Sequence, residues 1–122
     1  MAIHESAEMY METIFLLSKQ LPHVRSIDVA EHMGYSKPSV SRAVSLLKQE
    51  GYVLMDADGF LTLTQSGQAV AEKIFERHKV LSRMLIALGV SPEIAAEDAC
   101  KIEHVISDRS FEAIKQHMEE KQ

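Results

Sequence analysis

The chain of 122 residues lacks the features that would place it in a membrane or outside the cell. No apolar run approaches the roughly 20 residues that a membrane-spanning helix needs. Met1–Glu5 has neither the positive charge nor the apolar stretch of a secretory signal peptide. The single cysteine, Cys100, has no partner for an intramolecular disulfide, which fits a reducing compartment. We therefore expect a cytoplasmic protein.

The composition is ordinary, but the charge is unevenly distributed. Contents of 46% hydrophobic and 25% charged residues are typical of globular proteins and exclude disordered and fibrous classes. The net charge of −5 argues against nucleic-acid binding by the chain as a whole. From Lys19 to Glu50, however, five basic side chains outnumber three acidic ones, against eight and fifteen in the remainder. The first third is therefore locally basic and suited to a nucleic-acid contact.

Helical spacing and capping residues predict three helices in the first part of the chain, at residues 6–19, 27–32 and 37–50. Ser26 is the predicted cap of the second helix, which Gly34 closes in a left-handed conformation. Ser36 and Pro38 supply the cap and the first-turn proline of the third. Two short helices that meet at a tight turn are typical of a helix-turn-helix.

A hairpin is predicted directly after these helices. Tyr52–Met55 and Phe60–Leu63 are apolar runs on either side of Asp56–Gly59. The Asp-Gly pair within that turn is a strong short-range signal for a hairpin. A helix-turn-helix followed by a hairpin predicts a winged helix.

The remaining pattern is helical again, so the predicted fold class is mainly α. A long helix is expected from about Gln65, with Gly89 as its stop, followed by a helix over Pro92–Ile106 and a last one that begins at Ser107-Asp108. The middle helix has apolar residues on more than one side, namely Ile94, Ala95, Ala99, Ile102, Val105 and Ile106. This pattern indicates a dimerisation surface and predicts a homodimer.

Three types of metal ligand lie close together in the predicted middle helix. Cys100, Glu103 and His104 stand at i, i+3 and i+4, which places thiolate, carboxylate and imidazole on one helix face. On these residues alone a small buried cysteine beside a solvated polar face is the favoured interpretation. His78, Met9 and Glu12 are further candidates, although a methionine or histidine at helical spacing is often part of the core.

Three segments together resemble the diphtheria toxin repressor and manganese transport regulator family. They are Glu8–Glu12, Glu76–His78 and Asp98–Asp108, and the resemblance spans nearly the whole chain. Members of that family are dimeric bacterial repressors that bind operator DNA when loaded with Fe(II) or Mn(II). The resemblance implies a winged-helix DNA-binding domain at residues 1–64 and a helical metal-binding and dimerisation domain at residues 65–122. It also implies a homodimer on palindromic double-stranded operator DNA that controls metal-uptake or homeostasis genes.

The resemblance also implies a set of metal ligands. Met9, Cys100, Glu103 and His104 match the regulatory site of the iron-responsive branch. A thioether and a thiolate suit Fe(II) better than Mn(II), so Fe(II) is the expected cofactor and Mn(II) the alternative.

The sequence also shares features with the manganese branch. Glu12 matches a carboxylate ligand of that branch, and His78 matches a histidine that binds metal in both, which implies a second, weaker site. Ser82 and Ala96 stand where the iron branch has ancillary ligands. The chain ends at Gln122 without the extra C-terminal domain of the longer iron regulators, so we expect the short form.

The predicted third helix is expected to enter the major groove of DNA. Its candidate contacts are Ser36, Lys37, Pro38, Ser39, Ser41 and Arg42. Arg42 is the expected base reader, because arginine can donate two hydrogen bonds to a guanine edge. Arg25 and Ser26 are expected at phosphates. Each of these residues could equally be a solvated surface side chain.

Other classes of function compete with this interpretation. An enzyme with Cys100 as nucleophile and His104 as base is disfavoured, because no oxyanion loop or substrate pocket is recognisable. We expect neither a small organic substrate nor a membrane partner. A redox regulator that uses the Cys100 thiol, and a winged helix that binds only proteins, both remain open.

Overall fold

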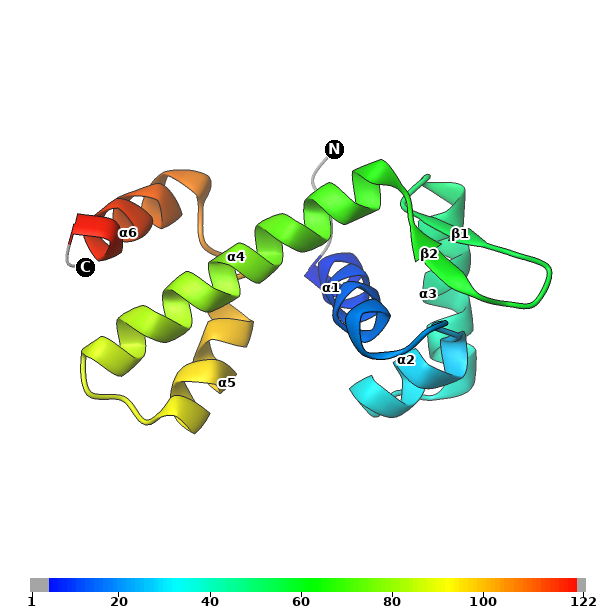
Figure 1. The fold of residues 1–122 in the computed structure, drawn as a ribbon, viewed down its shortest axis with the longest axis horizontal. Coiled ribbons are helices and arrows are strands. Elements are labelled where there is room, and N and C mark those ends of the chain that lie inside the picture. The colour runs from blue at the N-terminus through cyan, green and yellow to red at the C-terminus, as the bar shows by residue number, and fades with distance from the viewer. Residues whose placement is uncertain (1–4, 121–122) are drawn as a thin grey trace. The chain divides into compact units, whose positions relative to one another are not determined.

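The computed structural model describes residues 5–120, which form six helices and one two-stranded hairpin (Figure 1). Residues 1–4, where no signal peptide is expected, and residues 121–122 lie outside this range. The elements are α1 (Glu5–Gln20), α2 (Ser26–Met33), α3 (Lys37–Gln49), β1 (Val53–Met55), β2 (Leu61–Leu63), α4 (Gln65–Ala87), α5 (Pro92–Ile102) and α6 (Asp108–Glu120). The mainly α fold class is confirmed. No helix within residues 5–120 combines the length and the apolar character needed to cross a membrane.

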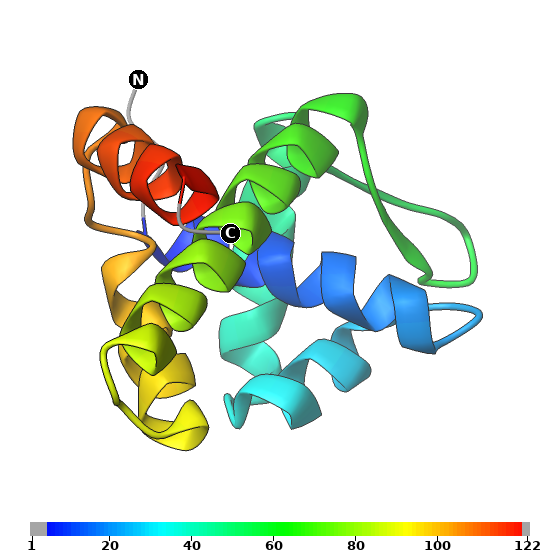
Figure 2. The same cartoon turned by 60° about the vertical axis from the view of Figure 1, so that its left-hand side comes forward.

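The chain divides into two compact units after Glu72. The first unit holds α1, α2, α3, the hairpin and the first eight residues of α4, and the second holds the rest of α4 with α5 and α6. The turned view in Figure 2 shows the hairpin and the two short helices of the first unit from another side.

The first unit is the predicted winged helix. α1 buries an apolar face that includes Met11 and Ile14, and α2 and α3 bury Val29 and Val40 in the same core. Gly34 closes α2 with φ of 72°, in the left-handed region as predicted. The Ser36 hydroxyl accepts a hydrogen bond from the backbone N–H of Ser39 at 3.3 Å, which confirms Ser36 as the cap of α3.

The prediction for the start of α2 was wrong by one residue. Arg25 occupies the N-cap position with extended backbone, and Ser26 is already helical. The Asp28 carboxylate reaches back and accepts the Arg25 backbone N–H at 2.8 Å. This contact satisfies the backbone N–H of the N-cap residue, while the N–H of Asp28 donates to the Arg25 carbonyl at 3.0 Å.

The hairpin is antiparallel and pairs Val53 with Leu63, Leu54 with Thr62 and Met55 with Leu61. Its turn is held by Asp56, whose Oδ1 accepts the backbone N–H groups of Asp58 and Phe60, each at 2.9 Å. An isolated antiparallel bridge joins Val24 to Leu61, so the segment before α2 lies along the outer edge of β2. The wing is thereby anchored to the helix-turn-helix.

The second unit contains one clear departure from the expected helices. α5 begins as predicted at Ser91-Pro92, but it ends at Ile102 instead of continuing to Ile106. Residues 103–107 form a non-helical connection, and α6 follows, with the Ser107 hydroxyl accepting the N–H of Ser110 at 3.1 Å. The long helix α4 ends at Ala87, and Gly89 follows with φ of 101°.

The junction between the wing and α4 leaves no room for a side chain at Gly67. A Cβ atom added there would lie 2.2 Å from the carbonyl oxygen of Tyr52. We expect Gly67→Ala to lower the free energy of unfolding by about 1–3 kcal/mol, as overpacking generally does. Urea denaturation of both proteins measures this difference, with Ser66→Ala at the exposed neighbouring position as the matched control. Equal stability of the Gly67 and Ser66 variants would contradict the packing described.

Candidate functional site

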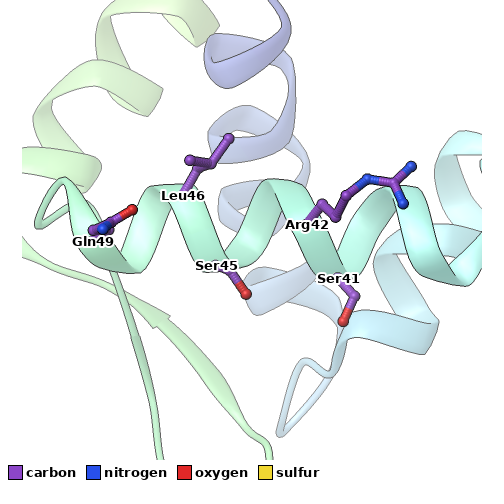
Figure 3. Close-up of a pocket in the computed structure, with 5 residues that line it drawn as sticks. All are labelled: Ser41, Arg42, Ser45, Leu46 and Gln49. Carbon is purple, nitrogen blue, oxygen red and sulfur yellow. The ribbon is translucent and has the colours of Figure 1, made fainter.

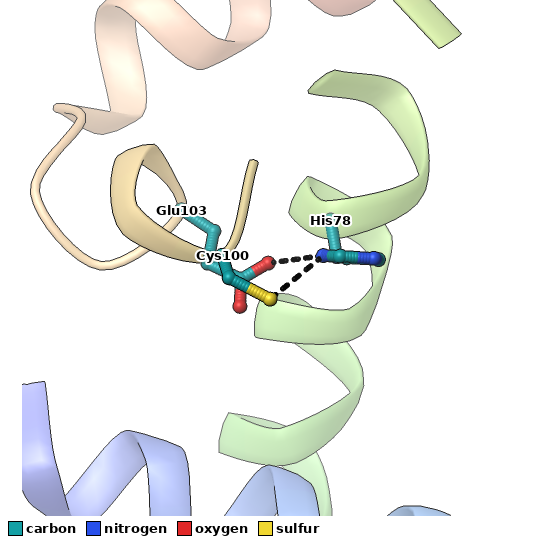
Figure 4. Close-up of side chains that lie close together, drawn as sticks. All are labelled: His78, Cys100 and Glu103. Carbon is teal, nitrogen blue, oxygen red and sulfur yellow. Dashed lines mark hydrogen bonds and ion pairs between the residues drawn. The ribbon is translucent and has the colours of Figure 1, made fainter. Parts of the chain in front are cut away.

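Three side chains of the second unit point toward one another (Figure 4). His78 lies on α4, Cys100 on α5, and Glu103 at the position that follows the last residue of α5. The His78 Nδ1 atom lies 3.0 Å from Glu103 Oε2 and 3.8 Å from Cys100 Sγ. One ligand atom from each residue lies within 4.8 Å of the other two. The structure thus brings together a nitrogen, a sulfur and an oxygen donor from two helices.

The carboxylate of this cluster is completely buried. Glu103 is 0% exposed, and its Oε1 atom has no hydrogen-bond partner among the residues that the structure describes. The Nε2 atom of His104 lies 3.4 Å from that oxygen. Since a buried carboxylate is costly unless it is paired or binds a metal, an oxygen without a hydrogen bond fits a ligand position. The donor set of imidazole, thiolate and carboxylate also fits a divalent transition metal.

A buried arginine holds the segment that carries Glu103 and His104. Arg77 Nη1 donates to the carbonyl oxygens of Glu103 at 3.1 Å and Ile106 at 2.8 Å. Its Nη2 donates to the Asp108 carboxylate. The last carbonyls of a helix have no intrahelical partner, and here a guanidinium whose side chain is only 7% exposed supplies one. Arg77 therefore fixes the end of α5 against α4, one residue from His78.

Arg77 belongs to the segment Glu76–His78 of the family resemblance, but its contacts were not predicted from the sequence. The available signal was its position, because Ile74, Arg77 and Leu81 share the i, i+3, i+7 spacing of one helix face. All three are buried. An arginine on an apolar stripe calls for buried acceptors, and the turn after α5 provides them.

The other predicted ligands lie in different parts of the structure. His78, which the resemblance assigned to a weaker second site, lies beside Cys100 and Glu103 of the main site. Met9 and Glu12 lie on α1, in the first unit, and are half-buried. Their participation in one site with the cluster stays a prediction.

The predicted DNA-contacting residues lie along the exposed side of α3 and at the start of α2. Ser36, Lys37, Pro38, Ser41 and Arg42 are exposed, whereas Ser39 is half-buried. The Ser39 hydroxyl accepts hydrogen bonds from Ser36 Oγ at 2.8 Å and Arg42 Nη2 at 3.5 Å. Arg25 is exposed and Ser26 is half-buried.

The outer side of α3 is hollowed and basic. Figure 3 shows a shallow pocket whose lining residues are Ser41, Arg42, Ser45, Leu46 and Gln49. The helix from Lys37 to Gln49 contains two lysines, one arginine and no acidic residue. This surface suits a polyanion approached by the helix side chains.

Two family models together match almost the whole chain. Residues 2–59 match the N-terminal DNA-binding domain of iron-dependent repressors. Residues 64–122 match the metal-binding and dimerisation domain of the same repressors.

Individual relatives include regulators named for manganese and for iron. The transcriptional regulator MntR of Escherichia coli O6:H1 is 34% identical over 106 residues, which cover 87% of this chain and 68% of that protein. The iron-dependent repressor IdeR of Mycobacterium tuberculosis is 31% identical over 105 residues, covering 85% of this chain and 46% of that protein. The solved structure of the manganese regulator SloR matches with a TM-score of 0.82 at 28% identity, covering 98% of this chain and 55% of that one. The chain therefore spans about half the length of IdeR and SloR.

The ion pair at the start of α6 makes the stability of the second unit dependent on pH. The Lys73 ammonium, 3.0 Å from the Asp108 carboxylate, lowers the pKa of Asp108 below its ordinary value of 3.8, and the Arg77 guanidinium adds to this effect. A lowered pKa in the folded state stabilises the fold above pH 3.8, and this gain is lost as the pH falls through the folded pKa.

We therefore expect Asp108→Asn to lower the melting temperature at neutral pH and to have little effect below the folded pKa of Asp108. Thermal unfolding of both proteins, from neutral pH to below pH 3.8, measures the difference in melting temperature. Glu112→Gln, at an exposed position of the same helix, is the control. A difference that stays constant with pH would show that the Asp108 charge does not contribute.

Proposed function

The chain belongs to the iron-dependent repressor family of metal-dependent transcriptional repressors, and from that premise we propose that Fe(II) activates its binding to operator DNA. The family consists of transcriptional repressors and not of enzymes. The proposed targets are metal-uptake or homeostasis genes. The observation that carries the proposal is the convergence of His78 and Cys100 on the buried carboxylate of Glu103.

We assign residues 1–64 to a winged-helix DNA-binding domain and residues 65–122 to a helical domain for metal binding and dimerisation. The matched segments 2–59 and 64–122 support this division. The exposed apolar side chains of Ile94 and Val105, at 53% and 71%, support a dimer surface on the second domain. A homodimer would bind a palindromic operator, because a two-fold protein matches two half-sites. The proposed location of this binding is the cytoplasm.

The proposed metal ligands are Cys100, Glu103 and His104 with Met9, joined by His78 and Glu12 at the same or an adjacent site. The buried Glu103 oxygen and the nearby His78 imidazole support the part of this set that belongs to the second unit. Met9 and Glu12 rest on the family resemblance. A bound divalent ion would supply positive charge to the buried carboxylate.

The thiolate supports Fe(II) over Mn(II). Mn(II) prefers carboxylate and water ligands, whereas a sulfur ligand is softer and favours Fe(II). The relatives include both an iron-dependent repressor and manganese regulators, so Mn(II) is the alternative that the experiment must rank.

Ligands drawn from both domains would let the metal select a DNA-competent arrangement of the dimer. Coupling of this kind, here between the metal site and the DNA-binding surface, typically changes affinity by about 5–150-fold.

On the DNA side, we assign base recognition to Arg42 and phosphate contacts or helix positioning to Ser36, Lys37, Pro38, Ser39 and Ser41, with Arg25 and Ser26 also at phosphates. The exposed, acid-free α3 supports this assignment.

The first test is anaerobic capture of genomic DNA fragments from the source organism by the purified chain, with Fe(II), with Mn(II) and with chelator. We expect a few promoter fragments to be enriched with metal, more strongly with Fe(II), and released by the chelator. Enrichment that survives chelation would favour a thiol-based or metal-independent regulator. No enrichment in any condition would favour a protein-binding winged helix.

A second test removes the sulfur ligand. We expect Cys100→Ala to weaken Fe(II) binding by at least the roughly 10–100-fold that loss of an outer-shell partner costs, and to weaken Fe(II)-activated DNA binding in parallel. Anaerobic titration of the metal and fluorescence anisotropy of a captured fragment measure the two effects. His117→Gln, an exposed histidine of α6, is the matched control. Unchanged activation by Fe(II), with loss of a response to oxidants, would assign Cys100 to a redox switch instead.

A further inference from the structure

The base of the wing carries a cluster of an imidazole, a guanidinium and a phenyl ring, which belong to His23, Arg25 and Phe60. The His23 and Phe60 rings are stacked, with centroids 4.1 Å apart and an interplanar angle of 5°. The Arg25 guanidinium carbon lies over the Phe60 ring, 4.7 Å from its centroid. We call this the wing-base cluster.

Local strand pairing explains why these three side chains meet. The backbone N–H of Leu61 donates to the Val24 carbonyl at 2.7 Å, and both side chains are buried. Successive side chains of an extended segment point to opposite faces, so the neighbours of Val24 and Leu61 turn away from the core. His23 and Arg25 are accordingly exposed, and Phe60 is half-buried.

The tip of the wing is acidic, in contrast to its base. Asp56 and Asp58 are the ionisable residues of the turn from Asp56 to Gly59, and both are exposed. The Asp56 carboxylate is held in place by the backbone N–H groups of Asp58 and Phe60. Two carboxylates at the tip repel DNA phosphates, so a wing of this charge pattern is unsuited to gripping the backbone with its tip.

The guanidinium of Arg25 is well placed to bind an anion. No salt bridge to Arg25 occurs within residues 5–120, and the nearby Asp28 carboxylate accepts the backbone N–H of Arg25. The Asp28 carboxylate already lies at the N-terminus of α2, so the Arg25 guanidinium is the group that a phosphate would meet at this position.

We propose that Phe60 is a positioning residue for DNA binding, which holds the Arg25 guanidinium against a DNA phosphate while the wing tip stays away from the backbone. His23 stacks on the ring and fixes its orientation. The inference rests on the proposed function, because it assumes that the chain binds DNA. The inference gives the wing a role in that function, which is to hold the Arg25 cation at the base of the hairpin.

The test is a double-mutant cycle on Phe60 and Arg25. Phosphate contacts are independent of sequence, so the probe is a fluorescent mixed-sequence DNA duplex, alongside a captured promoter fragment, each bound by the metal-loaded full chain over a range of salt concentrations. Arg25→Gln should weaken binding to both probes and reduce the salt slope by about 1. Phe60→Leu should weaken binding by about two- to fivefold, the size of an exposed cation–π contact.

The coupling energy between the two substitutions distinguishes a positioning role of Phe60 from a general contribution to stability. Phe60→Leu should have little further effect in the Arg25→Gln background, and Phe60→Tyr, which keeps the ring, should restore wild-type affinity. Melting temperature and Fe(II) affinity report whether each variant folds. If Phe60→Leu does not fold, His23→Gln, which removes the stack from an exposed position, takes its place in the cycle.

Additive effects of the Phe60 and Arg25 substitutions, or no effect of Phe60→Leu, would overturn the inference while the proposed function stands. Asp58→Asn is the matched test of the tip, and we expect less than a twofold change. A severalfold gain in affinity with a steeper salt slope would show that the tip contacts phosphates, and would also overturn it. Absence of metal-dependent DNA binding by the wild-type chain would instead overturn the proposed function.

Discussion

The buried carboxylate of Glu103 is the constraint on which the second unit depends. A charged group that is fully removed from water must be compensated by nearby cations or hydrogen bonds, or the fold loses stability. Here His78 approaches one carboxylate oxygen and His104 the other, yet the second oxygen has no hydrogen bond among the described residues. Stability and metal affinity are therefore linked at this site, because a cation that completes the compensation also stabilises the folded unit.

A second buried charge, that of Arg77, holds the segment at which α5 ends. In a helix that continued to Ile106, the carbonyls of residues 103–106 would be the last four and would have no intrahelical partner. Arg77 takes two of these carbonyls and links them to Asp108 at the start of α6. The turn between α5 and α6 thus has its own buried cation, separate from the cluster of ligands, and Glu103 is held by its main chain as well as its side chain.

Sequence reasoning succeeded where structure is determined locally. The Ser36 cap, the left-handed Gly34 and the hairpin around Asp56–Gly59 each depend on residues a few positions apart, and all three are confirmed. It failed at the end of α5, because the partner that ends the helix is Arg77, 26 residues earlier. It also failed at the cap of α2, where the N-cap residue is Arg25 instead of Ser26 and Asp28 accepts the backbone N–H of Arg25. The i, i+3 spacing found Cys100 and Glu103, but the approach of His78 to them depends on how α4 and α5 pack.

The distribution of charge explains how a chain with a net charge of −5 can still bind DNA through the surface of α3. Acidic side chains elsewhere repel phosphate, and the acid-free α3 leaves one surface where a duplex can approach. The acidic tip of the wing extends the same logic, since it disfavours a backbone approach at the end of the hairpin but not at its base. A divalent ion bound by Glu103 and the Cys100 thiolate would reduce the net negative charge by one, because the thiol loses its proton on binding. It would thereby lower the general repulsion, in addition to any change in domain arrangement. Metal activation then has an electrostatic component that depends on ionic strength and a conformational component that does not.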